Sequence, residues 1–146
     1  LQSDLTANIK KKKIKLNFTE GKYATGRRKK SIAKVWVKKG TGNIHVNGIK
    51  MNEYFKRPVH QIIVTRPLEI SEVAQSYDVK CSVKGGGLSG QAGAIILGIS
   101  KALISHDENL KKNLKKDKLT TRDSRVVERK KYGHRKARRS FQFSKR

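Results

Sequence analysis

The stretch that decides the fold is Tyr77–Ile104, YDVKCSVKGGGLSGQAGAIILGISKALI. Apolar and polar residues alternate along Tyr77–Lys84, which predicts a strand with one face buried and Cys81 inside as a reduced thiol. Three glycines follow, and apolar residues then recur at helical spacing. The predicted helical stripe consists of Ile95, Ile96, Ile99 and Leu103. The stretch therefore predicts a strand, a glycine turn and one main apolar helix.

The glycine turn satisfies the G-x-G-x-x-G pattern of dinucleotide-binding proteins at Gly85, Gly87 and Gly90. That fingerprint also requires a second parallel strand, which ends in an acidic residue about 20 residues further on. Here those positions are Ser105–Glu108, and they lead into a lysine-rich helical pattern. The dinucleotide interpretation is therefore disfavoured, and with it a small nucleotide-binding enzyme.

A phosphate-binding loop is excluded on chemical grounds. It needs a lysine and a hydroxyl at the positions that Gln91 and Ala92 occupy. Two interpretations remain, and the spacing does not choose between them. The glycines could simply allow a tight passage from strand to helix, or bare backbone N–H groups at a helix N-terminus could receive a phosphate of RNA.

Small residues also recur within the predicted helix. Gly90, Gly93, Ala94 and Gly98 keep it thin. A thin helix can approach a sheet or a nucleic-acid backbone closely.

Upstream, Ser31–Gly48 has the pattern of a hairpin. Ala33, Val35 and Val37 share one face, and Gly40–Gly42 is the expected turn. The Asn47-Gly48 pair predicts a second turn.

Several shorter elements complete the prediction. We expect a short helix at Met51–Phe55 limited by Pro58, a segment at 59–66 that is ambiguous between helix and strand, and a helix from an Asp107 N-cap to about Lys116. A last short strand is expected within 123–130. The predicted fold class is α+β, with about four strands, one main apolar helix and shorter helices.

Charge is the strongest compositional signal. The chain has 36 Lys plus Arg against 11 Asp plus Glu, a net charge of +25. Solubility needs only a few net charges, whereas self-repulsion of this size opposes compactness unless a polyanion neutralises it. Nucleic acid is the favoured partner. No run of about 18 apolar residues and no Lys-rich amphipathic stretch with an aromatic face supports a membrane partner.

Composition divides the chain into three regions. We expect a basic N-terminal arm at 1–22, a globular RNA-binding domain at 23–125 and an extended basic tail at 126–146. Arg129–Arg146 contains nine Lys or Arg and no acid, with Tyr132, Phe141 and Phe143 between the cations. Aromatic rings can stack on unpaired bases, and arginines can bind phosphates bidentately. No DNA-binding motif is present, which favours RNA over DNA.

Nothing in the sequence indicates catalysis. The four histidines are scattered without metal-ligand spacing, and a single cysteine offers no thiolate cluster. We expect no enzymatic activity, no metal and no cofactor.

Four segments taken together resemble the bacterial-type small-subunit ribosomal protein S nine. They are TGRRKKSIAKVWVKKGTGNIHVNG, GGGLSGQAGAIILGISKAL, TRDSRVVERKKYG and KARRSFQFSKR, which lie in order between Thr25 and Arg146. The resemblance covers roughly Tyr23 to Arg146 and leaves 1–22 outside.

The resemblance implies a structural protein of the small-subunit head, with a fold like the second domain of ribosomal protein S five. Its implied partners are the 3′ major domain of the small-subunit rRNA, the P-site tRNA and neighbouring head proteins, and no homo-oligomer is expected. The implied tRNA-binding residues are Ser144, Lys145 and Arg146. The implied rRNA-binding residues are Arg27, Arg28, Lys29, Lys30, Gly85, Gly86, Gly87, Arg122, Arg125, Arg129, Lys130, Lys131, Arg135, Lys136, Arg138 and Arg139.

Two departures from the family pattern matter. Lys118 and Thr120 stand where members commonly have Gly and Leu, which puts the local turn in doubt. Ser140-Phe141 resembles alphaproteobacterial and mitochondrial members. With the start at Leu1 and the lysine-rich arm, it favours a mitochondrial ribosome over a bacterial cytoplasm. The rival functions are an enzyme that uses the 85–90 loop and a DNA-compacting protein.

Overall fold

The computed structural model describes residues 16–145, and the predictions for residues 1–15 and for Arg146 lie outside them. One five-stranded sheet has the order β1-β2-β5-β3-β4. Its strands are β1 (Lys22–Arg28), β2 (Ser31–Lys39), β3 (Ile44–Val46), β4 (Ile49–Lys50) and β5 (Tyr77–Lys84). The helices are α1 (Met51–Tyr54), α2 (Pro58–Ile70), α3 (Leu88–His106) and α4 (Leu110–Lys116). The predicted α+β class is confirmed.

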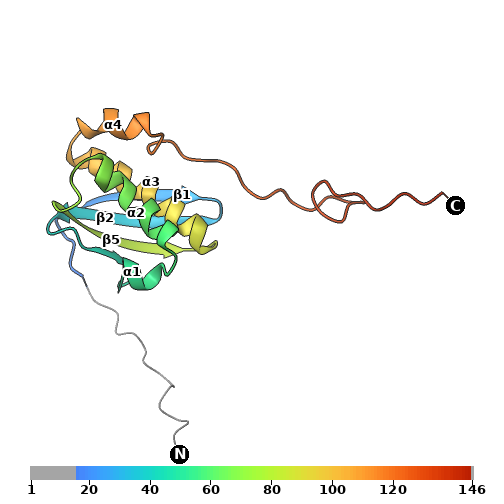
Figure 1. Ribbon diagram of the computed structural model, residues 1–146, viewed down its shortest axis with the longest axis horizontal. Helices are drawn as coiled ribbons and strands as arrows, with labels where there is room; N and C mark the ends of the chain where they lie inside the picture. The colour runs from blue at the N-terminus through green and yellow to red at the C-terminus, as the bar shows by residue number, and fades with distance from the viewer. Residues whose placement is uncertain (1–15, 146) are drawn as a thin grey trace, which may run out of the picture.

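Helices α2 and α3 lie together on one face of the sheet, and the core fills the space between them and the strands (Figure 1). The predicted inward faces of β2 and β5 are buried, and so are Ile95, Ile99 and Leu103 of α3. Ile96 is only half-buried. Burial raises the pKa of the Cys81 thiol, so that thiol stays protonated.

Helix α3 has the length and mean hydropathy of a membrane-spanning helix, 1.3 over its most apolar window. Its apolar side is nevertheless the centre of the core, where it packs on β1 and β2. These features are those of a buried core helix.

The small residues of α3 bring the helix close to the sheet. A Cβ placed on Gly98 would collide with the side chain of Val35, and a Cβ on Gly26 would overlap the backbone at Ala94 and Gly98. At Gly98 the small residue therefore allows contact with the sheet, and not the alternative approach to nucleic acid.

The hairpin predicted for Ser31–Gly48 is wrong. Strand β5 lies between β2 and β3, antiparallel to β2 and parallel to β3. The physical reason is Asp78 on β5, whose carboxylate accepts hydrogen bonds from the backbone N–H groups of Thr41, Gly42 and Asn43 at 2.9–3.0 Å. The predicted turn at Gly40–Gly42 forms, but it closes around the start of β5, and the strands on either side of it, β2 and β3, do not pair with each other.

Of the remaining predicted elements, some are confirmed and others are wrong. The Asn47-Gly48 turn is confirmed, with φ of 51° and 80°, and it joins β3 to β4. The short helix α1 is confirmed, and the ambiguous segment 59–66 is part of α2, which begins at Pro58. Strand β1 was not predicted, and the strand expected within 123–130 is absent, because no neighbouring strand edge pairs with those exposed residues.

Asp107 does not cap α4 directly. It ends α3, where its N–H donates to the Leu103 carbonyl at 2.9 Å, and its carboxylate accepts from the Asn109 N–H at 3.0 Å. Asn109 occupies the N-cap position of α4, and the predicted end of this helix at Lys116 is confirmed. The turn at Lys118 forms with φ of 56°, a left-handed conformation that glycine adopts most easily.

Candidate nucleic-acid interface

Two of the motifs predicted to bind rRNA meet at one end of the sheet, one of them basic and the other rich in glycine. The β1–β2 turn, Lys29-Lys30, packs against the glycine turn that follows β5, because Ile32 and Lys84 are register partners. The Ser31 hydroxyl donates to the Gly85 carbonyl at 2.9 Å. The cations of the first motif and the glycines of the second are therefore close neighbours.

Gly85 and Gly86 have structural reasons to be glycine. Their φ values are 77° and 61°, and a Cβ would strike the Lys30 carbonyl at Gly85 and the Ser31 hydroxyl at Gly86. Gly87 has open space around it. The tight-passage interpretation is thus supported for the first two glycines, and a role of all three toward RNA stays a prediction.

Gln91, at the position where a phosphate-binding loop has lysine, holds this turn in place. Its side-chain N–H₂ donates to the Gly85 carbonyl at 3.2 Å, and its oxygen accepts from the Tyr54 hydroxyl at 2.7 Å. In the described part of the chain α3 is followed by α4 rather than by a second parallel strand. Neither cofactor motif has its required context.

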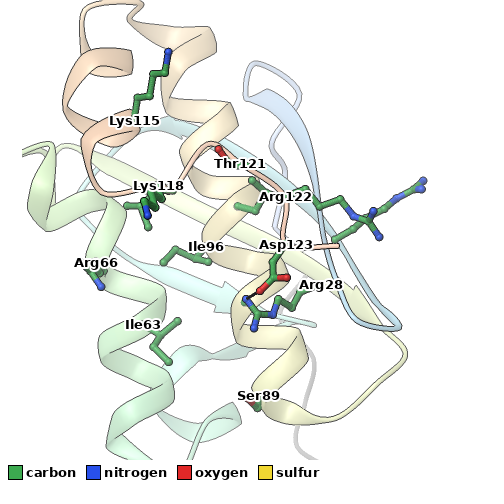
Figure 2. Close-up of a pocket in the computed structure, with 14 residues that line it drawn as sticks. Arg28, Ile63, Arg66, Ser89, Ile96, Lys115, Lys118, Thr121, Arg122 and Asp123 are labelled. Carbon is green, nitrogen blue, oxygen red and sulfur yellow. Dashed lines mark ion pairs between the residues drawn. The ribbon is translucent and has the colours of Figure 1, made fainter. Parts of the chain in front are cut away.

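An ion pair joins this end of the sheet to the segment that leads into the C-terminal tail. Arg28 of β1 contacts the Asp123 carboxylate at 2.9 Å (Figure 2). The Arg28 stem lies over Gly93 of α3, where a Cβ would be 3.0 Å from it. Sequence reasoning missed this role of Asp123, although an isolated acid in a strongly basic segment was the available signal.

The same carboxylate also binds Arg125. The Arg125 guanidinium donates to both Asp123 oxygens at 2.8–3.1 Å, and its backbone N–H donates at 3.0 Å. These bonds, with the charge of Arg28, hold the pKa of Asp123 far below its usual range. We call Arg28, Asp123 and Arg125 the latch, because they attach the tail to β1.

After Asp123, residues 124–145 contain neither helix nor strand and run away from the body (Figure 1). A local loop is closed by a bridge between His134 and Ser140, whose side chains lie 3.1 Å apart. Arg138 donates to both oxygens of Glu128 at 3.0 Å, which lowers the pKa of that carboxyl. Arg135 lies over the Phe141 ring at 5.4 Å.

The predicted tail residues are solvent-exposed wherever the structure describes them. Those residues are Arg129, Lys130, Lys131, Arg135, Lys136, Arg138, Arg139, Ser144 and Lys145, while Arg146 lies outside the described part. Tyr132 is 96% exposed and Phe143 84% exposed. Rings left in water among cations are what stacking on unpaired bases requires.

Two histidines pack within the fold. The half-buried His106 is 2.8 Å from the Val37 carbonyl and packs on Tyr77. The buried His60 packs edge-on against Phe55, and its Nδ1 has no hydrogen-bond partner among the described residues. Among residues 16–145 no three His, Cys, Asp or Glu side chains gather in a way that could hold a metal ion.

The comparison with known families agrees with this geometry. The model of the family described as Ribosomal protein S9/S16 matches residues 26–146, from Gly26 in β1 to the end of the tail. The match covers the latch, the glycine turn and every cation of the tail. The chain therefore belongs to the S9/S16 family of ribosomal proteins, and it is a structural protein of the small ribosomal subunit rather than an enzyme.

Proposed function

We propose that this protein binds the rRNA of the small-subunit head, in the 3′ major domain, and that its tail reaches the tRNA in the P site. The observation that carries the proposal is the latch, which attaches Asp123, and with it the neighbouring Arg122 and Arg125, to Arg28 at the end of β1. In this division of labour, residues 23–125 form the RNA-binding body and 126–146 form the tail, with 1–22 as a basic arm.

The tail is suited to a polyanion because its charge is hardly neutralised within the chain. Residues 121–146 contain two acids, Asp123 and Glu128, and both are bound by arginines of the same segment. Exposed guanidinium groups in such pairs still have N–H donors for phosphate, since each has five. The proposed tRNA contacts are Ser144, Lys145 and Arg146. The proposed rRNA contacts are Arg27, Arg28, Lys29, Lys30, Gly85, Gly86, Gly87, Arg122, Arg125, Arg129, Lys130, Lys131, Arg135, Lys136, Arg138 and Arg139.

The rRNA part of the proposal is tested by replacing Arg129, Lys130 and Lys131 with glutamine. The affinity for a transcript of the 3′ major domain should fall, and the slope of log K against log salt should flatten by about 0.7 to 0.9 for each phosphate that the variant no longer binds. The matched control removes three charges elsewhere, through Lys50→Gln, Lys56→Gln and Lys101→Gln. An equal loss of affinity in both triple variants would refute a dedicated tail interface.

The tRNA part is tested separately by deleting Ser144–Arg146. Small-subunit assembly should remain intact while tRNA dissociates faster from the P site, because the cations at the end of the extended segment are gone. Unchanged tRNA affinity across a salt series would contradict this part and leave the rRNA part standing.

We also propose that the ribosome in question is mitochondrial, with a bacterial cytoplasm as the alternative. The supporting features are Ser140-Phe141 and the lysine-rich arm, Lys10–Lys13. The test is sedimentation: the protein should travel with small subunits from an organelle fraction, and its recovery with cytosolic small subunits alone would contradict the proposal.

A further inference from the structure

A cleft of about 720 Å³ opens beside the latch, between α2, α3 and the segment after α4 (Figure 2). Its volume is in the range of pockets that take small ligands of nucleotide size. The family resemblance implies rRNA contacts for three of its lining residues, Arg27, Arg28 and Arg122, and the other eleven lie outside the predicted interface.

The rim of the cleft is strongly basic. Five of its cations come from separate parts of the chain: Arg27, Arg66, Lys115, Lys118 and Arg122. Arg66 has a distant partner in Asp117 at 3.6 Å, and the one acid of the lining, Asp123, is already occupied by the latch. The cleft therefore presents an excess of positive charge to whatever enters it.

The floor of the cleft is apolar. Ile63 of α2 and Ile96 of α3 point into the same space and are only half-buried, and Leu97 and Leu119 complete the floor (Figure 2). A phosphate ion alone would gain nothing from contact with this apolar floor, which offers it neither hydrogen bonds nor charge. A ligand that carries both a phosphate and a flat, largely apolar ring would satisfy both parts of the cleft.

One rim residue is held in an unfavourable conformation. Lys118 has φ of 56°, in the left-handed region, where Cβ is crowded and which glycine adopts without that steric cost. The backbone turn itself is held by the Lys118 N–H donating to Lys115 and the Leu119 N–H donating to Leu114. The turn thus does not need a lysine side chain, and strained residues of this kind cluster at functional sites.

Charge also restricts the occupant. The chain's own arm carries Lys10–Lys13, and the tail of a second copy is as basic as the rim, so neither is attracted. The rim is continuous through Arg122 with the latch and the tail, so an RNA strand on the tail could continue into the cleft. That continuity favours RNA over a separate acidic peptide.

We propose that this cleft binds one unstacked nucleotide of RNA, with its base on Ile63 and Ile96 and its phosphate on Lys118 and the neighbouring cations. The proposal rests on the rRNA-binding function proposed above and specifies a further contact on the body, which shares Arg27 and Arg122 with the rRNA contacts proposed there. Bases splayed out of a helix are a regular target of RNA-binding proteins.

The experiment uses the full chain with labelled isoleucine methyl groups, observed by NMR. The probes are adenosine 5′-monophosphate, a single-stranded hexaadenylate, inorganic phosphate and a hexaglutamate peptide. The methyl signals of Ile63 and Ile96 should shift saturably with the monophosphate, and at lower concentration with the hexanucleotide. The signal of the exposed Ile62, which is on α2 but not in the cleft, should not move.

Lys118→Gly separates binding from folding. It removes the rim cation and relieves the strained φ, so its unfolding midpoint should equal or exceed that of the wild type while monophosphate binding weakens several-fold. Lys112→Gln, which removes a charge from α4 outside the cleft, should leave binding unchanged.

Three results would overturn the proposal: no methyl shift with either nucleotide, equal shifts with inorganic phosphate, or tighter binding of hexaglutamate. Full binding by Lys118→Gly would do the same. The tail variant Arg129→Gln, Lys130→Gln, Lys131→Gln should still bind the monophosphate in the cleft. If that variant loses rRNA affinity while the cleft binds no nucleotide, the further inference fails and the proposed function stands.

Discussion

At Gly26 the backbone of strand β1 lies directly against the backbone of helix α3. A Cβ there would overlap the Ala94 carbonyl oxygen and lie 2.6 Å from the Gly98 nitrogen. Both neighbours are backbone atoms within regular elements, so they cannot rotate out of the way as a side chain could. The helix would have to lift from the strand that carries Arg27 and Arg28.

We predict that Gly26→Ala lowers the free energy of unfolding by about 3 kcal/mol, since overpacking of rigid neighbours is costly. Gly87→Ala is the control, because that site has open space and an ordinary φ of −99°. Its cost should be about 1 kcal/mol or less. Urea unfolding measures both, and equal losses would show that the β1–α3 approach is not what requires glycine.

At the scale of elements, the strand–turn–helix unit around Gly85 could be predicted because each part depends on local spacing. The alternation of β5 and the stripe of α3 are visible within one window of sequence. The pairing of β2 with β5 was not predictable in the same way, since it depends on Asp78 reaching a turn 35 to 37 residues away. Strand β1 was missed because Ala24 and Gly26 are too small to mark a buried face.

The Asp78 contact predicts a pH dependence of stability. Burial opposes the charged form, but the backbone N–H groups of Asn43, Thr41 and Gly42 together lower the pKa of this carboxyl below 3.8. A pKa lowered by folding stabilises the protein above the unfolded value, and that stability is lost as the pH falls through the folded value.

Asp78→Asn should therefore cost roughly 1 to 2 kcal/mol at pH 7, because hydrogen bonds to a charged group contribute roughly 1.5 to 3 kcal/mol and the asparagine oxygen retains part of that contribution. The difference from wild type should shrink as the pH falls below 4. Urea unfolding at a series of pH values measures it. Glu69→Gln, which removes an exposed carboxylate from α2, should change stability at pH 7 by less than about 0.5 kcal/mol. A difference that stays constant down to pH 2.5 would refute the role of the Asp78 charge.

At the scale of the whole molecule, the sequence identified the basic motifs but not how they are joined. Arg28 and Arg125 were each expected to face RNA, which stays a prediction, and the structure shows in addition that both bind Asp123. A single carboxylate in a basic segment gives no indication of which of many cations it will bind. The cleft was not predictable for a similar reason, because its rim comes from β1, α2, α4 and the segment after α4.

The net charge of +25 leads to a prediction for the free protein. Cations repel one another within the folded body, and salt screens that repulsion over about 10 Å at 0.1 M. Raising NaCl from 0.05 to 0.5 M should therefore stabilise the isolated protein by about 1 to 2 kcal/mol, or roughly 4 to 8 °C in melting temperature. NaCl is the salt to use, because sulfate also stabilises proteins without excess charge.

Over the same range the affinity for rRNA should fall, since each bound phosphate releases counterions. Calorimetry and binding titrations on one preparation measure the two trends together. A melting temperature that falls with NaCl would mean that attraction within ion pairs such as the latch outweighs the repulsion between cations. It would contradict the view that the free protein is destabilised because it lacks a polyanion.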